Sequence, residues 1–426
     1  MHLKEKFIHF LWQNGLFKKQ NLLSTANEPI EILSQGSLNT DSGPDFFNAK
    51  IKINGQLWAG NVEIHLKSSD WYVHAHEVDT AYDSVILHVV WEDDVPVFTT
   101  LNVPITTLIL KDYVNKSVLK NYIELFTTSK KYLNCEAEIS KTDAFLFANF
   151  KERLYFERLE QKSGLIYRLL LNSNNDWEAV LFKMLAKNFG LKINGEFFLK
   201  MANMLDFRVV RKSSNSQLQL EALFFGMSNL LKEEVNLPYY HKLKTEFDYM
   251  TKKFNLTKNA SVKPKFFRLR PQNFPTIRLS QLASLYHLRK SLFADVMAIN
   301  NIEEFYDLFE VATSAFWETH YTFTASSKKS KKKLTKSFID LLLINTILPL
   351  KVVYLKHQDR FDASKIIHLI NSIKPEKNSI IKNFRDLGVT ANNALETQAV
   401  LHLYTNYCAK NACLSCVVGN RFLKKK

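Results

Sequence analysis

The segment GPDFFNAKIKINGQLWAGNVEIHLK, residues 43–67, decides the fold that we expect for the front of this chain. Apolar and polar residues alternate over residues 45–53, which is the pattern of a half-buried strand. The pair Asn54-Gly55 that follows is a strong signal for a hairpin turn. Residues 57–66 are therefore expected to return as a second strand beside the first.

The same segment carries side chains suited to a divalent metal ion. The hairpin brings Asp45, at the start of one strand, close to Glu63 on the other. Because side chains alternate along a strand, Glu63, His65 and Lys67 point to one face. Two carboxylates suit Mg²⁺ or Mn²⁺, and such an ion can activate water and stabilise charge on a phosphodiester. Lys67 can add a point charge for phosphate. The pattern predicts a metal-dependent phosphodiesterase site.

The rest of the chain predicts two regions of different texture. Residues 3–13 have the apolar spacing of a helix, residues 84–91 read as a buried strand, and a helix is expected within 111–127. From residue 142 onward the apolar pattern is helical. We expect an α+β protein, with a mixed α/β domain over residues 1–140 and a large irregular helical region over residues 141–426.

Charge is distributed unevenly between these regions. Residues 1–140 hold 12 Lys and 17 acidic residues, a net charge of −5, whereas the remainder of the chain carries +20. A strongly basic region favours a polyanion such as DNA or RNA, although a lysine-rich composition alone gives the same charge. Arg268, Arg270 and Arg278 are candidate phosphate contacts, and salt bridges are their alternative role. The lysine-rich residues 326–336 are equally well explained as a solvated linker.

Histidines gather in the front region. His74, His76 and Asp79 could bind zinc or another transition metal. The simpler alternative is that they cap or line a short helix expected between residues 69 and 82. His88, within an apolar strand, is expected to be a hydrogen-bonded core histidine rather than a metal ligand.

The chain has four cysteines, too few for a disulfide framework. Cys408, Cys413 and Cys416 have metal-ligand spacing, and Cys135 could complete a set of four thiolates. Zinc and an iron–sulfur cluster fit this set equally well, and reduced structural cysteines are the alternative. One cysteine near the front and three near the end is an order similar to that of some helicase-associated nucleases, in which the cysteines join the chain ends.

The front region resembles the PD-(D/E)xK nuclease superfamily. In that superfamily an Asp begins one strand, a (D/E)-x-K tripeptide lies on the next, and a helix and another strand follow. Pro44-Asp45 matches the first element, and Glu63-Ile64-His65 matches the second except that His replaces Lys. The resemblance implies that Asp45 and Glu63 bind the metal and that Lys67 or His65 takes the role of the lysine.

A wider resemblance covers most of the chain. Residues 43–90, the segment RPQNFPTIRLSQLASL at 270–285 and CAKNACLSC at 408–416 look like a bacterial family catalogued as domain of unknown function 2851. This resemblance implies no activity.

Three functions follow as hypotheses. The first is a metal-dependent nuclease-like hydrolase acting on nucleic acid, and the second is a non-catalytic nucleic-acid-binding or scaffold protein on a degenerate nuclease core. The third is a zinc hydrolase centred on His74, His76 and Asp79. Glycine-rich phosphate loops and a G-x-S-x-G motif are absent from the sequence, which argues against NTPases, nicotinamide enzymes and serine hydrolases of that type. The N-terminal residues lack the pattern of a signal peptide and no apolar run is long enough for a membrane span, so we expect a cytoplasmic location.

Overall fold

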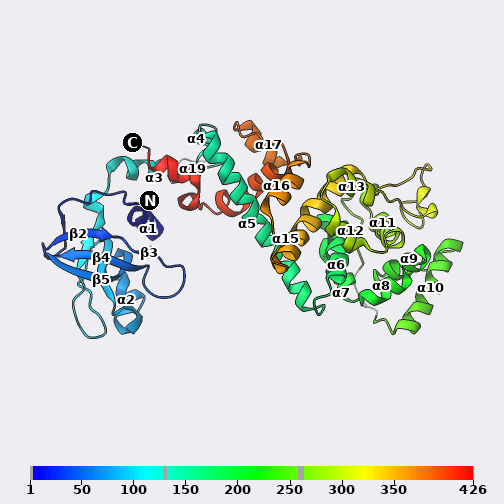
Figure 1. Ribbon diagram of the computed structural model, residues 1–426, viewed down its shortest axis with the longest axis horizontal. Helices are drawn as coiled ribbons and strands as arrows, with labels where there is room; N and C mark the ends of the chain where they lie inside the picture. Colours follow the sequence, from blue (N-terminus) through cyan, green and yellow to red (C-terminus); the bar gives the residue numbers. More distant parts are fainter. Residues whose placement is uncertain (1–2, 128–131, 258–262, 426) are drawn as a thin grey trace. The chain divides into compact units, whose positions relative to one another are not determined.

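A computed structural model describes residues 3–127, 132–257 and 263–425 and confirms the α+β class (Figure 1). The chain forms two compact units. The first contains Met1–Phe150, Asn383–Val389 and Leu403–Lys426, and the second contains Lys151–Lys382 and Thr390–His402. The first unit differs from the expected domain of residues 1–140 because two later segments of the chain, including the three C-terminal cysteines, pack within it.

A mixed sheet forms the centre of the first unit. Its strands follow the order β1-β2-β4-β5-β6-β7, and β3 pairs with β4. Their bounds are β1 Leu22–Leu23, β2 Pro29–Ser34, β3 Ser37–Leu38, β4 Phe46–Ile53, β5 Gln56–Lys67, β6 Val85–Glu92 and β7 Thr107–Ile109.

The expected hairpin is present as the antiparallel pair β4 and β5. Asn54 and Gly55 both have positive φ values, 50° and 81°, as a tight two-residue hairpin turn requires. Their left-handed conformation is tolerated by Asn and Gly at little cost. The pairing runs from the turn to Phe46 opposite Val62, so the start of β4 lies beside the middle of β5.

A short helical connection joins β5 to the parallel strand β6. It contains α2 (Asp70–Val73) and the 3₁₀ turns η1 (His76–Val78) and η2 (Thr80–Tyr82). Glu63 on β5 pairs in register with His88 on β6. The helical connection therefore begins just after the end of β5, the strand that carries Glu63, and leads back to the neighbouring strand β6.

Helices from both ends of the chain complete the core of the first unit. In α1 (Glu5–Asn14) the apolar residues Phe7, Ile8 and Leu11 are fully buried and belong to the same hydrophobic cluster as the sheet. The other helices are α3 Lys116–Thr127, α4 Glu136–Ile139 and α19 Val417–Leu423. The amide of Asn121 in α3 donates hydrogen bonds to carbonyl oxygens of Phe422 and Lys425, which ties α19 to α3.

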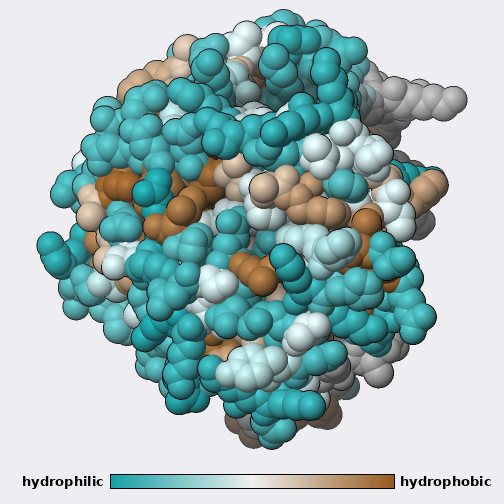
Figure 2. All heavy atoms as spheres, turned by 90° about the vertical axis from the view of Figure 1, so that its right-hand side faces the viewer, coloured by the Kyte–Doolittle hydropathy of each residue, from teal (hydrophilic) through white to brown (hydrophobic). Residues whose placement is uncertain are grey.

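The second unit is helical and has its own large hydrophobic core. Its helices are α5 Ala144–Leu171, α6 Trp177–Phe189, α7 Leu191–Asn203, α8 Phe207–Ser213, α9 Gln217–Met227, α10 Pro238–Phe254, α11 Pro275–Leu288, α12 Leu292–Ala298, α13 Ile302–Leu308, α14 Lys336–Leu342, α15 Leu348–His357, α16 Ala363–Asn371, α17 Ser379–Asp386 and α18 Ala394–His402; α5 and α17 extend into the first unit. Figure 2 shows a mainly hydrophilic surface on the face that it presents, with hydrophobic residues in separate small patches.

One helical stretch, Lys336–His357, is long and apolar enough to cross a membrane by length and composition alone. It runs through α14, a π-helical turn and α15, and 72% of its most apolar window is buried inside the protein. The core helix of a soluble protein passes the same test, so this stretch is weak evidence for a membrane span.

The close approach of β5 to β6 predicts a stability difference between two glycine-to-alanine changes. A Cβ at Gly60 would overlap the Cγ2 atom of Ile86 and lie 2.7 Å from the carbonyl oxygen of Ser84, whereas a Cβ at Gly164 in α5 meets nothing within 4 Å. Gly60→Ala should lower the free energy of unfolding by about 1–3 kcal/mol. Gly164→Ala should raise it by about 0.5–1 kcal/mol. Urea unfolding of both variants checks the signs, and equal effects would contradict the close packing at Gly60.

Candidate metal centre

The carboxylates of Asp45 and Glu63 are held by each other's strands. The backbone N–H of Asp45 donates to Glu63 Oε2 at 2.9 Å, and the backbone N–H of Ile64 donates to Asp45 Oδ2 at 3.0 Å. Asp45 keeps 22% of its side chain exposed, whereas that of Glu63 is only 6% exposed. Burial raises the pKa of the Glu63 carboxyl, and the charge of Asp45 adds to this, while His76 opposes it. The structure thus brings this pair together at one partly open position.

Two residues of α1 join this pair, although the sequence analysis did not single them out. His9 Nε2 lies 3.1 Å from Asp45 Oδ2 and 3.8 Å from Glu5 Oε1. Burial alone would lower the pKa of His9, but its contact with Asp45 and the charges of Glu5 and Glu63 raise it. Burial also raises the pKa of Glu5. The helix therefore adds an imidazole and a third carboxyl group to the site.

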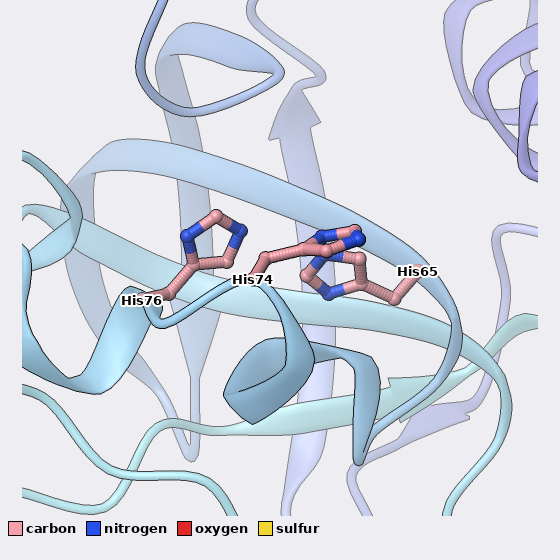
Figure 3. A group of neighbouring side chains, drawn as sticks. All are labelled: His65, His74 and His76. Atoms are coloured by element: carbon pink, nitrogen blue, oxygen red, sulfur yellow. The ribbon is translucent and has the colours of Figure 1, made fainter.

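Three further imidazoles stand on the other side of Glu63. His65, His74 and His76 each offer a ring nitrogen, and these atoms lie within 4.8 Å of one another (Figure 3). His65 Nε2 is 3.0 Å from His74 Nδ1, and Glu63 Oε1 lies 3.6 Å from His65 Nε2 and 3.4 Å from His76 Nε2. His65 and His76 are buried, and His74 is exposed. Nitrogen and carboxylate oxygen are together a ligand set for a transition metal.

The sheet and the helical connection fix the orientation of these rings. His65 Nδ1 lies 2.9 Å from Nε2 of the fully buried His88, which is a hydrogen-bonded core histidine as expected. His76 stacks on Tyr82, with 3.7 Å between ring centroids. Burial, with the neighbouring imidazoles, lowers the pKa of His65 to about 2, and burial lowers that of His88 to about 3. Both rings are therefore neutral at physiological pH and keep a lone pair.

Lys67 and Asp79 lie at the margin of this centre. The side chain of Lys67 is exposed. Burial alone would raise the pKa of Asp94, but hydrogen bonds with Ser69 and the charge of Lys67 lower it. Asp79 is exposed and accepts a hydrogen bond from the backbone N–H of Ala81, so it caps η2. Asp79 therefore has the capping role that was the alternative to metal binding. The carboxylate that lies beside His76 is that of Glu63.

The four cysteines lie near one another in the first unit, close enough to raise the pKa of neighbouring thiols. Cys413 and Cys416 are buried, and Asn134 donates a hydrogen bond to Cys413 Sγ at 3.5 Å. Burial, followed by the nearby sulfur atoms, raises the pKa of the Cys135 thiol to about 12 and also raises that of Cys408. These four thiols come from segments far apart in the sequence. Because burial and mutual repulsion oppose the formation of thiolates, they would ionise together only beside a cation.

The three arginines suggested as phosphate contacts differ in exposure. Arg268 and Arg270 are exposed. Arg278 is buried, and its guanidinium donates hydrogen bonds to Gln281 Oε1 and Asn273 Oδ1. Its expected role as a phosphate contact is therefore corrected, because a guanidinium enclosed in the helical core does not face a ligand.

The family of the chain follows from the family models. The model described as "Protein of unknown function (DUF2851)" matches residues 5–379, which is most of the chain and includes every residue of the metal centre. The chain belongs to the DUF2851 family. Comparison with curated proteins and with solved structures finds no match. Within this family, the function of the chain has to be inferred from its geometry.

The burial of Arg278 predicts a structural rather than a ligand-binding phenotype. Arg278→Ala leaves Asn273 and Gln281 without their buried donor, so it should lower the free energy of unfolding by about 2–4 kcal/mol. Arg270→Ala, at an exposed position, should change it by less than about 0.5 kcal/mol. Chemical denaturation followed by helical circular dichroism measures both changes. A stable Arg278→Ala variant with weakened DNA binding would restore the original assignment.

Proposed function

We propose that this chain is a metal-dependent phosphodiesterase that acts on nucleic acid, in the cytoplasm. The single observation that carries the proposal is the interlocked pair of carboxylates. Asp45 and Glu63 each accept a hydrogen bond from the other's strand, so both carboxylates are held in place. Pre-positioned carboxylate oxygens are the ligands that Mg²⁺ and Mn²⁺ use when they act with phosphate substrates.

The residues present fit such an ion. Asp45 is partly exposed and can face an incoming phosphate, while Glu63 is buried and anchors the site from the sheet. His9 lies within contact distance of Asp45 and offsets its charge. A bound Mg²⁺ or Mn²⁺ would supply an activated water and stabilise the developing negative charge on the phosphodiester. The protein's own part is to orient these groups and to limit the access of other water.

The role of the lysine in the (D/E)-x-K pattern is divided in this chain. His65 occupies the position of that lysine but is buried, and both of its ring nitrogens face other imidazoles. Lys67 is two residues further along and is exposed, so its ammonium group can contact a phosphate from solvent. We assign phosphate contact to Lys67 and a positioning role to His65.

The arrangement of strands supports the resemblance to the PD-(D/E)xK superfamily. Asp45 precedes β4, Glu63 lies on the antiparallel strand β5, and a helical connection leads to the parallel strand β6. The net charge of +20 on the chain after residue 140 supports a polyanionic substrate, and Arg268 and Arg270 are exposed candidates for backbone contacts.

The alternative is a nucleic-acid-binding or scaffold protein without catalysis. The observation that favours it is His65, because a buried imidazole cannot replace the cation at that position of the pattern. Under this alternative the chain binds nucleic acid without a divalent ion and cleaves nothing.

Cleavage assays separate these functions. Labelled single- and double-stranded DNA and RNA should be cut in the presence of Mg²⁺ or Mn²⁺, and Asp45→Ala and Glu63→Ala should reduce cleavage to background because each removes a metal ligand. Glu92→Ala, which removes an exposed carboxylate at the end of β6, is the matched control and should retain activity.

Binding is measured on the same proteins by fluorescence anisotropy at several salt concentrations. The affinity should fall linearly on a log–log plot, because phosphate contacts release counterions. Wild-type cleavage in both carboxylate variants would reject the enzyme assignment. Tight binding without cleavage under any divalent ion would favour the scaffold alternative.

The four cysteines support a second, structural metal group in the first unit. Four thiolates are a complete ligand set for one zinc ion and for an iron–sulfur cluster alike.

Metal analysis tests this assignment. The purified full chain should contain iron and sulfide, or one zinc ion, and Cys413→Ser should lose them and unfold at a lower temperature. Ser415→Ala, two residues away in the sequence, is the control and should keep both metal and stability. A wild-type chain purified anaerobically without metal and with the same stability as Cys413→Ser would end this idea.

A further inference from the structure

Ligand atoms from three segments of the first unit converge on one point beside Glu63. The strand β5 supplies Glu63 and His65, the residue after α2 supplies His74, and η1 supplies His76. Figure 3 shows the three imidazole rings near the turn between α2 and η1, with those of His65 and His74 overlapping in the view. The separations are 3.0 Å from His65 to His74, 3.6 Å from His65 to Glu63 and 3.4 Å from His76 to Glu63.

These separations fit the coordination shell of one ion. Ligands that each lie about 2.0–2.1 Å from a tetrahedral metal are about 3.4 Å apart, and smaller angles shorten this. The measured values of 3.0, 3.6 and 3.4 Å lie around that figure. Hydrogen bonding is weakest at His76: its Nε2 atom is buried, the residue is only 7% exposed, and its carboxylate neighbour, Glu63 Oε1, lies 3.4 Å away, which is long for a hydrogen bond. A buried nitrogen with only a long contact to a carboxylate is costly, and a bound ion between the two would remove that cost.

The surroundings hold the rings as a metal site requires. Metal-binding histidines commonly donate the second ring N–H to a neighbouring acceptor, which fixes the tautomer. His65 Nδ1 can donate to His88 Nε2 at 2.9 Å, which leaves the lone pair of His65 Nε2 directed to the other ligands. His76 is fixed by stacking on Tyr82 and by the edge of Trp71, at 3.7 Å and 5.2 Å between ring centroids.

We infer that His65, His74 and His76 bind one divalent transition-metal ion of the zinc class, with Glu63 Oε1, which lies close to His65 and His76, as the oxygen ligand that completes the set. Three imidazole nitrogens and one carboxylate oxygen suit Zn²⁺ and its neighbours, whereas Mg²⁺ prefers oxygen ligands and several waters. His74 is exposed, so an ion can reach the site from solvent.

Glu63 connects this site with the carboxylate pair. Its Oε1 atom faces the histidines, and its Oε2 atom faces the backbone N–H of Asp45. One carboxylate can therefore contribute to two neighbouring ions, an arrangement used to hold both the attacking and the leaving oxygen of a phosphodiester. This sharing rests on the proposed function, whereas the binding of the zinc-class ion by the histidines does not.

The test measures metal binding rather than activity. The full chain is stripped with chelator and titrated with Co²⁺, whose visible absorption reports nitrogen and oxygen ligands and whose near-ultraviolet bands report thiolates, and Zn²⁺ is then used in competition. The test variant is His74→Ala, because its exposed ring can be removed without opening a cavity. His368→Ala, at an exposed histidine of α16, is the matched control. Cys413→Ser separates any metal at the cysteines.

Cys413→Ser should show the Co²⁺ spectrum without thiolate bands at one equivalent, displaced by Zn²⁺. Wild type and His368→Ala should show the same nitrogen and oxygen ligand spectrum, together with thiolate bands from metal at the cysteines. His74→Ala should weaken this binding about tenfold or more while unfolding at the wild-type temperature. Equal Zn²⁺ affinity with and without His74→Ala in the Cys413→Ser background would overturn the inference, as would folded wild type that binds no ion except at the cysteines. Zinc binding that depends on His74 in a chain that cleaves no nucleic acid would support this site and reject only the proposed function. Cleavage with Mg²⁺ in a chain whose histidines bind no Zn²⁺ would do the reverse.

Discussion

The reciprocal hydrogen bonds between Asp45 and Glu63 are the constraint on which the metal centre depends. Glu63 accepts a hydrogen bond from the backbone N–H of Asp45, and Asp45 accepts one from the backbone N–H that follows Glu63. These two bonds hold the start of β4 against the middle of β5. Without these bonds a buried glutamate would have to give up its hydration with little in return. With them, one carboxylate oxygen of Glu63 faces Asp45 and the other faces the histidines. Both the α1 residues and the three imidazoles are then arranged around an anchor that the backbone itself positions.

Local sequence patterns were enough to predict the part of the fold that carries this anchor. The Asn54-Gly55 turn sets the register of the hairpin from Ile53 to Ala49, because both residues accept a left-handed conformation, and an irregularity between Phe46 and Ala49 then shifts the pairing by one residue. The register in turn determines which residue of β5 lies near Asp45. The α+β class followed from the change in apolar period, from two residues in the front region to that of a helix further on. These inferences needed only interactions between residues close together in the chain.

The rest of the site depended on tertiary contacts that have no local signature. His9 reads as one polar position on an amphipathic helix, and only the packing of α1 against the sheet brings it to Asp45. Asp79 had a suitable spacing after His76, yet its side chain is used by the backbone of η2. Arg278 was a candidate phosphate contact, but it is the fourth residue of the buried helix α11. In each case burial, which one sequence reveals poorly, decided the role.

The return of the C-terminal segment to the first unit affects how the protein folds during synthesis. The hairpin and α1 leave the ribosome early, but α19, which is tied to α3, emerges only after the whole of Lys151–Lys382 has been made. Domains usually fold in the order of synthesis. Here the second unit can fold first, while the apolar sides of α1 and α3 stay partly exposed until the C-terminal helix has been synthesised. A nascent chain stalled before residue 403 would therefore expose apolar surface that chaperones bind, even with its sheet already formed.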